Sequence, residues 1–345
     1  MTEGKKSKGC LGTLLWGIGV MSLVAILSLA ILFINQRIAL SRLHQGYSPP
    51  GKLVAVNSHF MHIHYVGSGS PTVVINAGNG SFSLEWMPIQ EQLSQSMRVC
   101  TYDRAGYSWS EPGPGPRHGV QVIDELRALL TAAGESAPYI LVGHPLGGVH
   151  IRIFALQYPH EVAGLVLIDT ASRLTITSDY EQRIADSIGF YRVMNLLTRS
   201  GILRILGPLG GESSMPETAR TLRLELQETY LNLLLNPNQY ATAIAEMEQL
   251  PRTFQQASQL MVGERPLNDL PLIVLTAGQM AAPGSTPLGE QHMPVNDIHI
   301  EQQEELAQLS SQGEQRLIPE SGHLVHLDEP AAVLQAILDV YDLSE

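Results

Sequence analysis

The residues whose types and spacing most clearly suggest catalysis surround a Gly-x-x-x-Gly turn at positions 143–147. The apolar run Tyr139–Val142 leads into this turn, and a helix-like stretch follows it. Such a strand–turn–helix context is typical of the Gly-x-Ser-x-Gly nucleophile elbow, whose central serine attacks a carbonyl carbon. In this chain the central position is Pro145. Because proline carries no hydroxyl, thiol or carboxylate, no covalent acyl intermediate can form at this position.

A candidate base and two candidate acids follow later in the chain. His323 stands in Ser-Gly-His directly after the last expected strand and before a helix that begins near Pro330. A histidine on such a loop can act as a general base, whereas His326 is the weaker candidate. Asp169 ends another expected strand, where its carboxylate can fix the tautomer of a histidine. Asp297 is the alternative acid.

Proline also constrains the backbone of the turn. An elbow nucleophile has a positive φ, whereas proline fixes φ near −65°. We therefore predict a relaxed turn, with the helix starting at Pro145 and the N–H of Leu146 displaced. No substitute nucleophile is obvious, because Ser81 and Ser83 lie on the loop after an earlier strand and His144 is expected to point elsewhere.

The elements that must position these residues alternate along the chain. Short apolar runs predict strands at 72–75, 98–102, 139–142, 165–168, 272–275 and 315–318, with helical patterns such as 120–133 and 149–157 between most of them. This alternation predicts an α/β fold with a mostly parallel sheet and helices on both faces. Residues 172–262 show only helical patterns, such as 218–234 and 240–249, and are interpreted as a helical cap.

An opening hairpin is predicted over 53–66, with His59, His62 and His64 at exposed positions. These histidines have no local carboxylate or cysteine partner, so no metal site is expected. No dinucleotide or Walker motif appears, and no cofactor is implied. Two cysteines give no disulfide framework.

The N-terminus predicts a transmembrane helix, because no charged residue occurs from Leu11 to Ile34. Lysines precede this run and arginines follow it, so we expect a single-pass anchor in the cell membrane with its N-terminus in the cytoplasm and the body outside. A cleaved signal peptide is the alternative. The net charge of −12, from 33 acidic and 21 basic side chains, argues against nucleic acid as a partner. The sequence does not indicate an oligomeric state.

Three motifs in order resemble the α/β-hydrolase superfamily, within it a bacterial membrane-anchored branch. They are Gly67-Ser-Gly-Ser-Pro-Thr-Val-Val74, Tyr102-Asp-Arg-Ala-Gly-Tyr-Ser-Trp-Ser110 and Gly164-Leu-Val-Leu-Ile-Asp169. The resemblance covers nearly everything from residue 52 to 341.

The resemblance implies that His323 is the catalytic base and that the backbone N–H groups of Leu146 and Asn79 form the oxyanion hole. The superfamily more often carries its acid after the strand at 272–275. The segment that follows this strand in the present chain, 276–282, has no carboxylate, which favours Asp169 over Asp297.

The implied activity is hydrolysis of an ester or a related acyl substrate, with the serine route lost or strongly impaired by Pro145. The alternative is a catalytically silent fold that binds a small apolar ligand or a protein partner. The expected domains are a cytoplasmic stub and anchor at 1–35, a linker at 36–51, a hydrolase-like core at 52–171 and 263–345, and the cap at 172–262.

Overall fold

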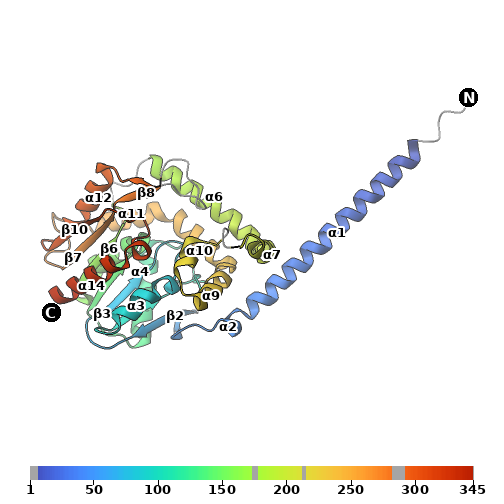
Figure 1. The fold of residues 1–345 in the computed structure, drawn as a ribbon. Helices are drawn as coiled ribbons and strands as arrows, with labels where there is room; N and C mark the ends of the chain where they lie inside the picture. The colour runs from blue at the N-terminus through green and yellow to red at the C-terminus, as the bar shows by residue number, and fades with distance from the viewer. Residues whose placement is uncertain (1–6, 173–177, 212–214, 282–291, 345) are drawn as a thin grey trace, which may run out of the picture.

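The centre of the chain is an eight-stranded sheet with the order β1-β2-β4-β3-β5-β6-β7-β10. The structure, a computed structural model, describes residues 7–172, 178–211, 215–281 and 292–344 (Figure 1). The strands are β1 Lys52–Val56, β2 His59–Val66, β3 Thr72–Asn76, β4 Val99–Tyr102, β5 Tyr139–Gly143, β6 Val162–Ile168, β7 Leu272–Ala277 and β10 Gly313–Ile318. Only β1–β2 and β2–β4 pair antiparallel in this sheet, so the predicted mostly parallel sheet is confirmed.

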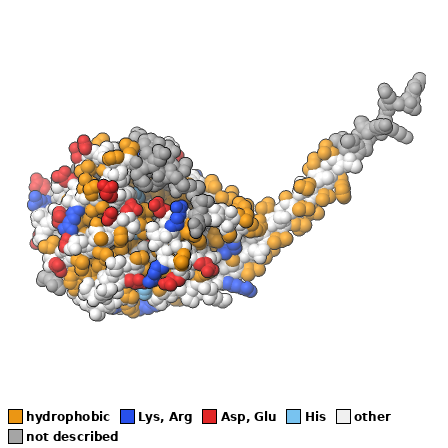
Figure 2. All heavy atoms as spheres, in the orientation of Figure 1, with side chains coloured by type: hydrophobic (Ala, Val, Ile, Leu, Met, Phe, Trp, Pro, Cys, Tyr) orange, Lys and Arg blue, Asp and Glu red, His pale blue; other side chains and the backbone are white. Residues whose placement is uncertain are grey.

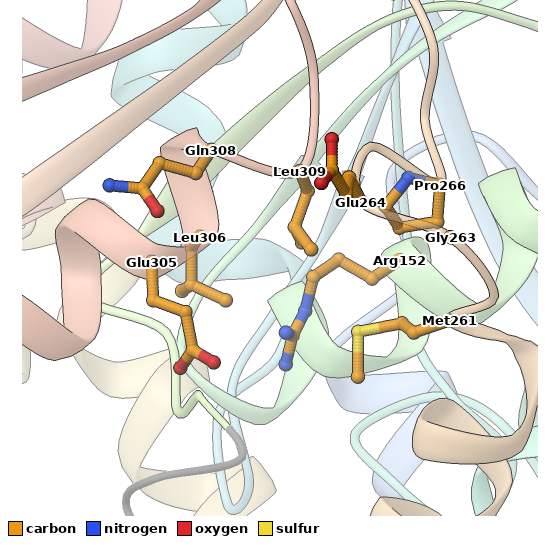
Figure 3. A pocket seen from close by; sticks show the side chains of 9 residues that line it. All are labelled: Arg152, Met261, Gly263, Glu264, Pro266, Glu305, Leu306, Gln308 and Leu309. Carbon is orange, nitrogen blue, oxygen red and sulfur yellow. The ribbon is translucent and has the colours of Figure 1, made fainter.

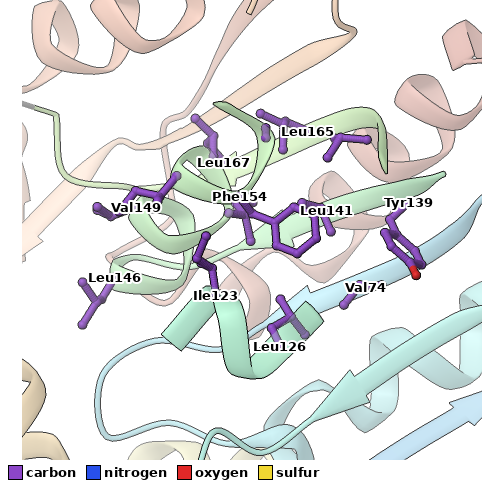
Figure 4. Close-up of a cluster of buried hydrophobic side chains, with 14 of the residues drawn as sticks. Val74, Ile123, Leu126, Tyr139, Leu141, Leu146, Val149, Phe154, Leu165 and Leu167 are labelled. Atoms are coloured by element: carbon purple, nitrogen blue, oxygen red, sulfur yellow. The ribbon is translucent and has the colours of Figure 1, made fainter. Parts of the chain in front are cut away.

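Helices cover both faces of this sheet (Figure 1). Alternate residues of one strand face opposite layers: Val73 packs with α3 (Met87–Leu93) and α14 (Pro330–Ser344), whereas Val74 packs with α4 (Gly119–Ala133) and α5 (Leu146–Gln157). Figure 4 shows the cluster that contains Val74, in which Ile123, Leu126 and Phe154 pack against leucines of the strands. Because both faces are buried, the central strands are apolar at nearly every position.

A helical segment separates β6 from β7. It contains α6 Ser178–Ser200, α7 Ile202–Leu209, α8 Glu217–Thr221, α9 Leu224–Leu234, α10 Pro237–Glu248 and α11 Leu250–Leu260. The described part of 172–262 therefore holds helices and no strand, as the patterns predict. The last helix differs from its neighbours, because Leu250, Phe254 and Ala257 of α11 join the main core and pack with α4 and α5.

The remaining elements are short or lie at the edges of the sheet. They are α2 Leu43–Gly46, η1 Ser83–Trp86, η2 Pro159–Glu161, β8 Gln279–Ala281, β9 His292–Pro294, α12 Asp297–Ala307 and α13 Val325–Asp328. Of these, α12 packs beside β7 and β10, at the end of the sheet where the candidate acid and base are expected.

The N-terminal helix α1 (Ser7–Ser41) projects from the body (Figure 1). By length and composition, Gly12–Ser41 is long and apolar enough to cross a membrane, and none of its most apolar window is buried. The residues interpreted as a linker, 36–51, instead hold the end of α1 and the short α2. Gln36 is buried, donating through Nε2 to the carbonyl of Leu235 at 2.8 Å and accepting from Arg204 Nε at 2.9 Å. These contacts explain why helix continues where a tether was expected.

The hairpin histidines are not all exposed, which corrects the expectation from the sequence. The hairpin itself forms, but His59 and His62 are buried and His64 is partly buried. His62 Nδ1 lies 2.7 Å from Asp103 Oδ2, and its ring centre lies 4.9 Å from that of Trp109. The segment after β4, which carries Asp103 and Trp109, packs against His62, and alternation within the hairpin alone does not reveal this.

Truncating Gln36 should loosen the junction between α1 and the cap. Gln36→Ala removes two hydrogen bonds at a buried site and leaves Arg204 with one fewer partner, so the free energy of unfolding should fall by about 1–3 kcal/mol. Thermal unfolding of the full-length protein in detergent, followed by circular dichroism, measures this. Asn35→Ala is the matched control, because Asn35 is the exposed neighbour on the same helix. Equal midpoints for the two variants would show that the junction contributes nothing.

Candidate active site

The turn between β5 and α5 holds Pro145 in right-handed helical backbone, with φ −71° and ψ −43°. The helix begins one residue later than predicted, at Leu146, and Pro145 occupies its N-cap position. The relaxed turn follows from the fixed φ of proline, which cannot reach the positive values that an elbow nucleophile adopts. The side chain at the turn therefore supplies only ring carbons, and the interpretation of position 145 as that of a nucleophile stays a prediction.

Close backbone contact joins this turn to the loop after β3. A Cβ on Gly78 would lie 2.5 Å from Cδ of Pro145, and a Cβ on Gly147 would collide with the carbonyl oxygen of Asn76. Only glycine fits at both positions. The two segments that carry the predicted oxyanion donors, Asn79 and Leu146, are thus in close contact. The displacement of the Leu146 N–H stays a prediction.

The side chain of Asn79 points to the cap. Its Nδ2 donates to the carbonyl of Ala243 at 3.2 Å and to Oε2 of Glu246 at 3.1 Å, both on α10. The backbone N–H of Gly80 donates to the hydroxyl of Tyr107 at 3.3 Å. The loop after β3 is therefore held from the cap side.

Asp169 and His323 form a hydrogen-bonded pair beside the turn. Oδ2 of Asp169 lies 2.6 Å from Nδ1 of His323, and Asp169 is only 7% exposed. Its backbone has φ 42°, in the left-handed region, immediately after β6. The backbone N–H of Ala277 donates to Oδ1 at 3.2 Å. The carboxylate is thus placed to accept the second ring proton of the histidine, as an acid–base pair requires.

A second histidine, His299 of α12, shares this carboxylate. Its Nε2 lies 2.8 Å from Oδ1 of Asp169. Burial by itself raises the pKa of Asp169, but the hydrogen bonds from His299 and His323 outweigh it and hold that pKa well below its ordinary value. Sequence reasoning missed His299, because it lies far from either partner along the chain and belongs to no recognisable motif.

The alternative acid, Asp297, is the first residue of α12 and is exposed. The hydrogen bond at Nδ1 of His323 is made with Asp169. Asp297 precedes His299 by two residues, so the helix that carries it contributes the imidazole rather than the carboxylate.

The ring of His144 packs against two other histidine rings, one of which is that of the candidate base. Nε2 of His144 lies 2.8 Å from the carbonyl oxygen of His323, and its ring is 4.7 Å from that of His323 and 4.8 Å from that of His326. His326 is buried and stacks on Trp86 at 4.2 Å, which agrees with a packing role. The expectation that His144 points elsewhere is wrong, because its ring lies in the site. Burial, together with the two neighbouring histidines, holds its pKa well below the ordinary value, so the ring is neutral.

The two serines of the loop after β3 make their hydrogen bonds close to that loop. The hydroxyl of Ser81 donates to the carboxylate of Glu85, and the backbone N–H of Ser83 donates to Asp103 at 2.8 Å. Ser81 therefore braces its own loop, whereas Ser83 joins that loop to the segment after β4, and its hydroxyl also lies 3.5 Å from Nδ1 of His62. That neither serine replaces the nucleophile stays a prediction.

A buried ion pair between Arg104 and Glu246 connects the loop after β3 to the cap. Nε of Arg104 donates to Oε1 of Glu246 at 2.8 Å, and Nη2 donates to the carbonyl of Gly78 at 2.8 Å. Burial raises the pKa of Glu246, but the charge and hydrogen bonds of Arg104 dominate and lower it to about 2. Arg104 therefore supports the fold by joining the loop after β3 to α10.

The cleft in Figure 3 lies apart from this chemistry. Its volume is about 210 Å³, and Arg152, Glu305 and Leu306 are among the residues that line it. Pro145, Asp169 and His323 do not line this cleft. Within the described residues, no group of three or more histidine, cysteine, aspartate or glutamate side chains is placed to hold a metal ion.

Comparison with known proteins points to one fold. A family model described as alpha/beta hydrolase fold matches residues 71–207. An esterase from Thermogutta terrifontis superposes with a TM-score of 0.59 at 22% identity, covering 85% of this chain and 98% of the esterase.

Two relatives in sequence come from a bacterium and a fungus. The uncharacterized protein YqjL of Bacillus subtilis is 24% identical over 278 residues, or 81% of this chain and 86% of that protein. The probable transporter efuK of Hormonema carpetanum is 36% identical over 131 residues, which are 36% of this chain and only 19% of that protein.

Neutral His144 should make stability depend on pH. Because its pKa is lower in the folded than in the unfolded chain, the unfolded chain binds more protons below about pH 6.5, and the free energy of unfolding falls as pH decreases. His144→Gln should reduce that fall by up to about 1.4 kcal/mol per pH unit. Denaturant unfolding between pH 7 and pH 5 measures the slope. His160→Gln, at an exposed position, should leave it unchanged, and an unchanged slope in His144→Gln would contradict the assignment.

Proposed function

Because the chain belongs to the α/β-hydrolase superfamily, we propose that it is a member in which the serine route of ester or acyl hydrolysis is lost or strongly impaired. On this proposal it keeps the acid–base pair Asp169–His323 and holds a small apolar ligand, of acyl type, beneath the cap. The observation that carries the proposal is Pro145 in helical backbone at the place of the nucleophile.

The chemistry follows from what each side chain can supply. In a serine hydrolase of this fold, the histidine removes the hydroxyl proton and the acid stabilises the resulting imidazolium. His323 and Asp169 are paired at 2.6 Å, but Pro145 offers no proton to remove and no atom to attack. Loss of a triad serine lowers turnover by on the order of 10⁶-fold. The remaining route is activation of a water molecule by His323, which the intact pair favours as the second candidate function.

Restoring a serine tests the proposal. Pro145→Ser should gain hydrolysis of short p-nitrophenyl esters by at least on the order of 10³-fold, because the base and acid are already in place. It should also form a fluorophosphonate adduct at position 145, which the unaltered protein lacks. Adding His323→Ala should abolish the gain.

Pro145→Ala is the matched control, since it frees the backbone in the same way without supplying a hydroxyl. A folded Pro145→Ser protein with no gain would show that the assignments of His323 and Asp169 are wrong. Rapid hydrolysis by the unaltered protein that His323→Ala removes would show that catalysis survives the proline.

We also propose that α1 anchors the protein in the cell membrane with its N-terminus in the cytoplasm. The apolar run Leu11–Ile34 follows lysines at positions 5, 6 and 8 and precedes Arg37 and Arg42. The burial of Gln36 against the cap supports a retained helix, because α1 runs without a break from its apolar run to this buried contact.

The mature protein should therefore contain residues 1–35. Intact-mass measurement on protein from its native membrane tests this directly. A chain that begins near residue 36 would identify the segment as a cleaved signal peptide.

A further inference from the structure

The anchor helix α1 docks on the cap where its apolar run ends. A Cβ on Gly201 would lie 2.6 Å from the carbonyl oxygen of Leu32 and 3.1 Å from Cβ of Gln36. Arg204 donates to Gln36, and its Nη1 donates to Asn232 of α9 at 3.1 Å. Helix α7, which begins at Ile202, therefore starts at the level where α1 would leave the hydrocarbon core.

The cap carries exposed apolar side chains on this side. Figure 2 shows hydrophobic side chains along α1 and on the adjoining edge of the body. Those on the nearby helices are Ile205, Leu206 and Leu209 of α7, and Phe190, Val193 and Leu196 of α6. Leu209 is 77% exposed. Such a surface is costly in water and favourable at a membrane interface, where apolar helix faces sink below the headgroups.

A cavity lies behind α7, between this surface and α9. Its volume is about 650 Å³. Most of its lining is apolar, including Met194, Leu203, Leu231 and Leu235, while Arg204 and Glu228 are the charged groups among the lining residues. The volume falls within the range of small-molecule sites, and the apolar lining suits a hydrocarbon ligand.

The inner end of this cavity approaches the candidate active site. Tyr240 lines the cavity, and its ring lies 6.2 Å from that of Tyr191. A Cβ on Gly80 would lie only 2.7 Å from the hydroxyl of Tyr191, so this ring touches the loop after β3. One pair of tyrosines thus separates the cavity from the loop that carries Asn79.

We propose that this cavity takes one acyl chain of a bilayer lipid, which enters past α7 from the membrane that holds α1. The inference rests on the proposed membrane anchor but not on the loss of the serine route. A bilayer lipid is the occupant, because the apolar surface beside the cavity is continuous with the end of the anchor helix.

Photolabelling of the full-length protein in nanodiscs tests the proposal. The nanodiscs contain phosphatidylcholine with a diazirine near the end of one acyl chain, and adducts are mapped by mass spectrometry. We expect adducts on Leu203, Leu231 and Leu235. Leu231→Trp fills the cavity and should lower this labelling by about tenfold.

Leu224→Trp is the matched control, because Leu224 lies on the same helix α9 and is 84% exposed. It should retain full labelling. Leu235→Trp replaces Leu231→Trp if the latter fails to fold, as judged by its thermal transition. Adducts confined to α1, or undiminished in a folded cavity-filling variant, would overturn the proposal.

A second arm separates the two sources of an acyl chain. Unlabelled nanodiscs receive free diazirine-bearing palmitate instead of the labelled lipid. Labelling of the cavity by the free acid alone would overturn the bilayer as the source. Hydrolysis by Pro145→Ser is measured independently of labelling, so failure of the cavity proposal and failure of the proposed function are distinguishable.

Discussion

The fixed φ of Pro145 constrains the turn at the centre of the candidate site. At Pro145 the backbone stays in the helical region, and α5 continues from it without the strained turn that presents a nucleophile. Its ring packs against Gly78, where a side chain would collide with it. The loop after β3 therefore lies against a carbon ring, and the loop that carries His323 contacts the residue before that ring, His144. Asp169 and His323 form their hydrogen-bonded pair beside a turn whose proline side chain has no hydroxyl, thiol or carboxylate.

Buried polar contacts connect this centre to the cap. The Arg104–Glu246 pair places two charges out of water, and such a pair is tolerated only when its remaining hydrogen-bonding groups are satisfied. The guanidinium also reaches the carbonyl oxygens of Ala77 and Gly78, and the carboxylate also accepts from Asn79 and Tyr107. The position of the cap above the site is thus set by hydrogen-bond geometry as well as by apolar packing.

Much of this architecture is readable in the sequence, for identifiable reasons. Buried parallel strands are apolar throughout and can be recognised as such. Asp169 and His323 can be predicted as site residues because they follow the ends of β6 and β10. The burial of His62 was not readable, because it depends on Asp103, a residue 41 positions away. The contact of His299 with Asp169 spans 130 positions and leaves no periodic signal. Local patterns predict elements, whereas contacts between loops depend on how the elements assemble.

The buried side chain of Gln36 has a mechanical consequence. A domain on a slack tether tumbles freely above a bilayer, but in this protein the helix proposed to enter the membrane is also wedged into the cap. Seven residues of helix, Asn35–Ser41, follow the apolar run, and at ~1.5 Å per residue they extend it by only ~10 Å. The distance and the orientation of the body relative to α1 are thereby fixed. If α1 spans a bilayer, the same side of the body faces the lipid surface as the protein diffuses.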